Sequence, residues 1–134
     1  MLTHITTSEK LKEEAEEIQS LLEITISDNI EEAKQRATDL SVYNARTGKM
    51  LADAKYHLAD KMKSEVMDII RFQAKDAYAT AKATNLLCDS VCRDEKYLVD
   101  WIERLNRSTV HQIDLIRTFI SLEKELMKNS PMQP

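Results

Sequence analysis

Histidine and carboxylate side chains that share one predicted helical face are the first candidates for chemistry. Asp53, His57 and Asp60 lie at positions i, i+4 and i+7, and His111 with Asp114 forms a second pair of this kind. Di-metal helical bundles use a Glu-x-x-His motif on each of two helices, and the order and acid type here depart from it. Solvated ion pairs are the favoured interpretation, and we predict no catalytic residue, no metal and no cofactor. A metal-dependent helical-bundle enzyme that uses Asp53, His57, Asp60 and His111 remains an alternative.

Basic side chains form the second candidate group. Residues 33–82 hold ten basic and six acidic side chains, with three tyrosines among them. Positive grooves with aromatic platforms bind single-stranded nucleic acid. The basic residues do not keep to one helical face, so an ordinary exposed surface is favoured. The alternative is a nucleic-acid-binding accessory protein, for single-stranded DNA or RNA, that would use five residues of this stretch: Arg46, Lys49, Lys55, Lys61 and Lys63.

The elements that must position these residues are predicted from the scarcity of turn-forming residues. The 134 residues include one glycine and two prolines, and both prolines lie among the last four residues. Sandwiches, barrels and α/β folds need frequent turns, which glycine usually supplies. The sequence therefore predicts an all-α fold in a single domain, residues 1–134. A hydrophobic fraction of 43% and a charged fraction of 31% are typical of long two-faced helices.

Two segments begin the predicted chain, an acidic helix with its joint in residues 1–28 and then a long helix. Thr6 and Glu9 fit a capping box, with Ser8 as the alternative N-cap, which places the first helix at about Thr7–Glu23. Ile24–Asn29 combines β-branched residues with N-cap residues, so we expect a joint there. Apolar residues then recur at steps of three and four, which predicts a helix at about Asn29–Phe72 with coiled-coil-like packing.

The second half of the chain repeats the apolar pattern. Thr84 and Asn85 are our predicted corner, because asparagine tolerates the left-handed conformation when glycine is missing. A last helix is expected from Leu87 to about Lys128. Its apolar residues recur at steps of three and four, apart from one charged position at Asp94 or Glu95. Residues 29–128 would then form an elongated antiparallel helical hairpin, followed by a tail at 129–134.

Polar residues interrupt the apolar rows. With a corner at residues 84 and 85, Asn44 and Thr47 would lie level with Leu126 and Leu122, so a polar partner for Asn44 is expected from another subunit. Gly48 costs helix stability, and we interpret it as a point of close approach by another helix backbone. His57 and His111 would lie at similar heights.

A hairpin of two helices leaves apolar surface uncovered, and a homo-oligomer is the least demanding way to bury it. Some residues of the apolar rows must be intramolecular core, and the sequence does not sort them. The predicted interface consists of Leu40, Asn44, Gly48, Leu51, Leu58, Leu98, Trp101, Leu105, Ile116 and Phe119.

Charge and cysteine spacing bear on compartment. Residues 1–32 carry nine acidic and two basic side chains, which favours a solvated acidic face. Cys88 and Cys92 lie four residues apart, unlike a zinc knuckle or a thioredoxin-type pair, and we expect reduced thiols. Met1–Glu9 has no secretory pattern, and no apolar run reaches membrane-span length. A cytoplasmic protein with no membrane partner is expected.

One stretch carries a resemblance. Residues 44–58, NARTGKMLADAKYHL, are similar to segments of short all-helical proteins of bacterial phages and integrated mobile elements. The resemblance implies a bacterial or phage origin and no activity or site residue. The function predicted from the sequence is a non-enzymatic helical interaction or assembly module, homo-oligomeric, with a further protein partner possible.

Overall fold

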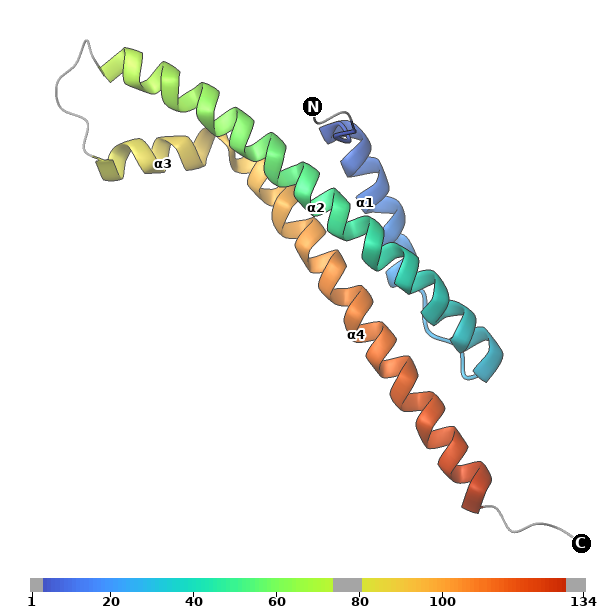
Figure 1. Ribbon diagram of the computed structural model, residues 1–134. Coiled ribbons are helices and arrows are strands. Elements are labelled where there is room, and N and C mark those ends of the chain that lie inside the picture. The colour runs from blue at the N-terminus through green and yellow to red at the C-terminus, as the bar shows by residue number, and fades with distance from the viewer. Residues whose placement is uncertain (1–3, 74–80, 130–134) are drawn as a thin grey trace, which may run out of the picture.

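The computed structural model describes residues 4–73 and 81–129, the side chains of 72, 73 and 81–84 excepted. It contains four helices: α1 (Ser8–Leu22), α2 (Ile30–Gln73), α3 (Ala81–Val91) and α4 (Arg93–Asn129), drawn in Figure 1. Within these ranges there is no strand, and the predicted all-α class is confirmed. In the same part of the chain, no helix has the length and apolar character needed to cross a membrane.

Side-chain caps start the first two helices close to their predicted positions. The N-cap of α1 is Thr7, whose hydroxyl accepts from the Lys10 amide at 3.4 Å. Thr6, with Ser8 as the alternative, was the expected cap, and that detail is wrong: the Thr6 hydroxyl accepts a hydrogen bond from Arg46, and Ser8 is the first residue of α1. Before α2, Asn29 Oδ1 accepts from the Glu32 amide at 3.0 Å, which satisfies a free donor of the first turn.

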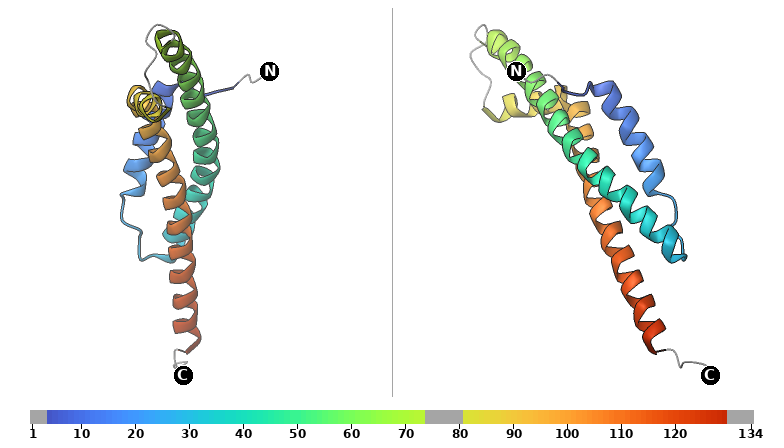
Figure 2. Two further views of the ribbon diagram at one scale, coloured as in Figure 1. Left: turned by 90° about the vertical axis from the view of Figure 1, so that its left-hand side faces the viewer. Right: turned by 45° about the vertical axis from the view of Figure 1, so that its right-hand side comes forward.

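α2 and α4 are the two long elements of the molecule. Their 44 and 37 residues correspond to about 66 Å and about 55 Å of helix. They lie side by side and run in opposite directions, and the described molecule is elongated (Figures 1 and 2). In both views of Figure 2 the C-terminal end of α4 reaches past the start of α2.

The predicted corner is wrong. Thr84 and Asn85 lie inside α3, and no described residue has a positive φ. α2 ends at Gln73 and α3 begins at Ala81, and the residues between them lie outside the described part of the chain. Because α2 ends well before residue 84, every predicted pairing of positions on α2 and α4 is shifted.

The expected helix from Leu87 to Lys128 is two helices that meet at Cys92. Figure 1 shows α3 at an angle to α4. The Cys92 amide still donates to Cys88 O at 3.1 Å, and both cysteines are free and buried. The break lies next to Asp94 and Glu95, where the charged position interrupted the apolar row. Both residues stand in the first turn of α4, where carboxylates are favourable.

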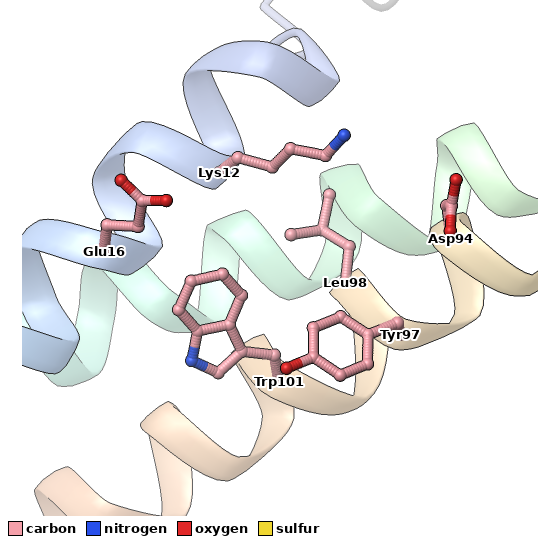
Figure 3. A pocket seen from close by; sticks show the side chains of 6 residues that line it. All are labelled: Lys12, Glu16, Asp94, Tyr97, Leu98 and Trp101. Atoms are coloured by element: carbon pink, nitrogen blue, oxygen red, sulfur yellow. The ribbon is translucent and has the colours of Figure 1, made fainter.

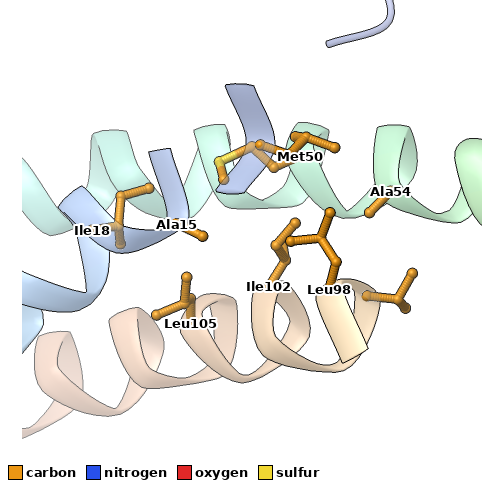
Figure 4. Packing of buried hydrophobic residues seen from close by; sticks show 9 residues of the cluster. Ala15, Ile18, Met50, Ala54, Leu98, Ile102 and Leu105 are labelled. Atoms are coloured by element: carbon orange, nitrogen blue, oxygen red, sulfur yellow. The ribbon is translucent and has the colours of Figure 1, made fainter. Parts of the chain in front are cut away.

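The core has two parts. In the larger part, α1 packs into the angle between α2 and α4 (Figure 4), through Leu11, Ala15, Ile18, Met50, Ala54, Leu98, Val99, Ile102 and Leu105. A smaller cluster of Ala33, Leu40 and Ile116 joins α2 to α4 near the start of α2. α1 therefore covers only one stretch of the α2–α4 pair.

Candidate interaction surface

Most residues of the predicted interface lie inside the chain's own core. Leu40, Leu98, Leu105 and Ile116 are each at most 4% exposed. Four others are partly buried and pack against the two core clusters: Leu51, Leu58, Trp101 and Phe119. The apolar surface of these residues is largely used within one chain.

The polar positions of the apolar rows meet each other within the chain. Asn44 Nδ2 donates to Thr109 Oγ1 at 2.9 Å, and Asn106 Nδ2 donates to Thr47 Oγ1 at 2.9 Å. Both threonines are fully buried. The expected levels of Asn44 and Thr47 with Leu126 and Leu122 are wrong, since they assumed a corner at residues 84 and 85. We name Asn44, Thr47, Asn106 and Thr109 the polar layer.

Gly48 does not mark a close approach of two backbones within the chain. It lies on the exposed side of α2, and a Cβ built there would meet only Asn106 Nδ2, at 4.0 Å. That distance is ordinary van der Waals contact, so the position has room for alanine.

Four side chains on one side of α2 hold the N-terminal segment, residues 4–7. Arg46 donates to Thr6 Oγ1 at 3.2 Å, and Lys49 Nζ donates to His4 O at 2.9 Å. His57 Nε2 lies 2.6 Å from Thr6 O. Asp53 Oδ2 accepts from the Thr6 amide at 3.1 Å and also pairs with Lys49. These contacts fasten the segment that leads into α1.

Asp53 is the buried charge of this cluster, with 3% of its surface exposed. Burial by itself raises the pKa of the carboxyl. The hydrogen bonds from the Lys49 ammonium and from Thr6 outweigh burial, and the net pKa lies below the ordinary value. Asp53 is therefore a charged structural anchor.

The nucleic-acid candidates are dispersed among other contacts. Arg46 binds both carboxylate oxygens of Glu14, at 2.7 and 2.9 Å, in addition to Thr6. Lys49 is held as described above, and Lys61 pairs with Glu95 at 2.9 Å. Within residues 4–73 and 81–129, only Lys55 and Lys63 of the five candidates have no such bond.

The metal candidates do not come together. Asp53 is occupied by Lys49 and Thr6, while Asp60 and His111 are exposed. Near His57 on α2, Lys61 pairs with Glu95 of α4. Near His111 on α4, Gln112 accepts from Arg36, which lies much earlier on α2. The two histidines thus lie at different heights, against expectation. Across the described ranges, no group of three or more His, Cys, Asp or Glu side chains is arranged to hold a metal ion.

Sequence reasoning named Phe119 as an interface residue but missed that it lies in an exposed apolar row on α4. Leu115, Leu122 and Leu126 are 61%, 60% and 64% exposed, and the half-buried Phe119 lies between them. The contact of Arg36 with Gln112 places the start of α2 level with about Thr118. α4 continues beyond that level to Asn129 without α2 beside it (Figure 1). Helix lengths counted from the correct corner would have shown that the last helix extends past its partner. The predicted corner was misplaced, so this signal was lost. We name Leu115, Phe119, Leu122 and Leu126 the α4 stripe.

A pocket of about 320 Å³ opens between α1 and the first turns of α4 (Figure 3). It is lined by Lys12, Glu16, Asp94, Tyr97, Leu98 and Trp101. Of these, Leu98 and Trp101 were predicted as interface residues, and the other four were not predicted as site residues.

Comparisons with protein-family models, with curated proteins and with solved structures found no match. Function is therefore inferred from the chemistry of these surfaces.

Proposed function

We propose that the chain is a non-enzymatic helical assembly module that associates with a second copy of itself through the α4 stripe. The observation that supports this proposal is the exposure of Leu115, Leu122 and Leu126 along one side of α4, whose C-terminal end extends past the start of α2. Contiguous exposed apolar side chains are a feature of interaction sites. When two equivalent surfaces pack together, each copy removes its own exposed apolar area from water.

The spacing of the stripe favours a second copy over an unrelated partner. The four residues are separated by four, three and four positions, which reads the same in both directions. In an antiparallel pair of α4 helices, Leu115 of one copy faces Leu126 of the other, and Phe119 faces Leu122. A two-fold interface requires such a self-complementary surface.

Within each copy, the proposal treats α2 and α4 as a long antiparallel hairpin with coiled-coil-like packing. The steps of three and four in both apolar rows, together with the polar layer between them, support this description. The resemblance of residues 44–58 to helical phage proteins agrees with a bacterial or phage origin and stays a prediction.

The mass in solution tests the assembly. We expect light scattering behind a size-exclusion column to give a dimer at about 100 μM, because interfaces of modest size have dissociation constants near the micromolar range. Leu122→Glu combined with Leu126→Glu should give a monomer with unchanged helix content. Val42→Glu is the matched control, since Val42 is 65% exposed on α2 and lies outside the stripe. A monomeric wild type, or a dimer that survives the double substitution, overturns the proposal.

Cross-linking tests the antiparallel geometry. Protein with Leu115→Cys and protein with Leu126→Cys should form a disulfide when the two are mixed under mild oxidation. Each alone should cross-link poorly, because identical positions lie far apart in an antiparallel pair. The native Cys88 and Cys92 are buried and leave the background low. Efficient cross-linking of either protein alone indicates a parallel arrangement and contradicts this geometry.

The nucleic-acid alternative has less support, because Arg46, Lys49 and Lys61 already bind acceptors of the chain. We expect no retention on single-stranded DNA at about 50 mM salt, where phosphate contacts are strongest. Retention that falls steeply with added salt would restore the alternative.

A further inference from the structure

The pocket between α1 and α4 has aromatic walls and an apolar floor. Leu98 forms the floor and is 4% exposed, while Tyr97 is 68% exposed and Trp101 is half-buried. Figure 3 shows the two rings side by side below α1, with the Glu16 carboxylate above the indole. The ring centroids are 6.2 Å apart and the planes are inclined by 48°.

The indole of Trp101 is held in place. Its Nε1 donates to Gln19 Oε1 on α1 at 3.0 Å, so the ring is tied to both helices that form the pocket. A ring fixed in this way loses little conformational freedom when a ligand stacks on it, and such preorganisation favours binding.

The charges around the pocket favour a cation. Glu16 and Asp94 supply two carboxylates, and Lys12 supplies one ammonium that reaches across Leu98 toward Asp94 in Figure 3. Among the described residues, neither carboxylate has an ion pair or a side-chain hydrogen bond. Both therefore retain their capacity to accept hydrogen bonds from a ligand.

We propose that this pocket binds the guanidinium of an arginine side chain presented by a partner protein. A guanidinium is planar and stays charged, so it stacks on an aromatic ring and donates two parallel hydrogen bonds to a carboxylate. A lysine ammonium lacks the flat surface and the fork of donors. The site lies on a single copy and does not include the α4 stripe, so it is independent of self-association.

The single tryptophan of the chain provides a direct measurement. In a ¹⁵N-labelled protein, the one indole resonance belongs to Trp101. We expect this resonance to shift saturably on titration with acetyl-Gly-Arg-Gly-amide, with half-saturation in the millimolar range, on the order of 1 mM for one such side chain. The matching lysine peptide should bind more weakly. The citrulline peptide, which has nearly the same shape without the charge, should cause no saturable shift.

Charge variants separate a cation site from an anion site. Glu16→Gln and Tyr97→Leu should each lower the affinity for the arginine peptide by about threefold or more. Lys12→Gln should raise the affinity for the arginine peptide, because a charge that repels the guanidinium is removed. Glu17→Gln is the matched control, since Glu17 is exposed on α1 and does not line the pocket. Equal shifts with citrulline, or weaker binding after Lys12→Gln, overturn the proposal.

Discussion

At the scale of single residues, buried polar groups define how α2 and α4 lie against each other. The polar layer offers hydrogen bonds in one register, and a shift of the helices would take the threonine acceptors away from the side-chain amides of Asn44 and Asn106. The threonine hydroxyls would keep only the bonds to carbonyls of their own helices. Each lost hydrogen bond costs about 0.5–1.5 kcal/mol. The layer therefore selects the observed level of the two helices over neighbouring ones.

Replacing Asn44 tests this role. Asn44→Ala should lower the free energy of unfolding by about 1 kcal/mol, because the hydrogen bond to Thr109 is lost. In a double-mutant cycle with Thr109→Ala, urea denaturation should give a coupling energy of about 0.5–1.5 kcal/mol. Thr38→Ala serves as a control, since the Thr38 hydroxyl donates to Lys34 O of its own helix. A coupling energy near zero would contradict the hydrogen bond between Asn44 and Thr109.

Acid should lower the stability of the fold by protonating two carboxylates, Asp53 and Glu95. Burial alone raises the pKa of Asp53 and of Glu95, but hydrogen bonds from Lys49 and Thr6 and from Lys61 leave both pKa values lowered. A lowered pKa stabilises the fold above the unfolded-state value near 4, and this stabilisation is lost as pH falls through the folded-state pKa.

The urea midpoint should therefore decrease between about pH 5 and about pH 3. Asp53→Asn should flatten this dependence, whereas Asp60→Asn, at an exposed position of the same helix, should leave it unchanged. An Asp53→Asn protein with the full pH dependence would show that Asp53 is not the anchor described above.

At the scale of helices, the sequence predicts what depends on local pattern. The limits of α1 and α2 follow from caps and from apolar periodicity, which act within a few residues. The level of α4 against α2 depends on where the chain reverses, and no glycine or proline marks that position. One misplaced corner at Thr84 and Asn85 therefore produced errors far away, in the expected levels of Asn44 and of His111.

The same reasoning applies to Gly48, the only glycine in the chain. Gly48→Ala should raise the free energy of unfolding by up to about 1 kcal/mol, because alanine favours the helix and its methyl group fits beside Asn106. Thermal and urea denaturation measure the change. A loss of stability or of the dimer would instead support the sequence-based prediction that another helix backbone approaches this residue.

At the scale of the whole molecule, length dominates. A compact globule of this size has a radius of gyration of about 14 Å, whereas α2 alone extends for about 66 Å. Small-angle X-ray scattering of the Leu122→Glu and Leu126→Glu protein should give a radius of gyration of about 20 Å or more for the monomer. A value near 14 Å would show that the long helices fold back on themselves in solution.

The reach of α4 past the start of α2 has a consequence for spacing. Two copies joined tip to tip along their α4 ends point their bodies in opposite directions, and the resulting rod is on the order of 100 Å long. The two Trp101 pockets would then sit toward opposite halves of that rod. If both proposals hold, this dimer would keep two bound arginine-bearing partners at a separation determined by helix length.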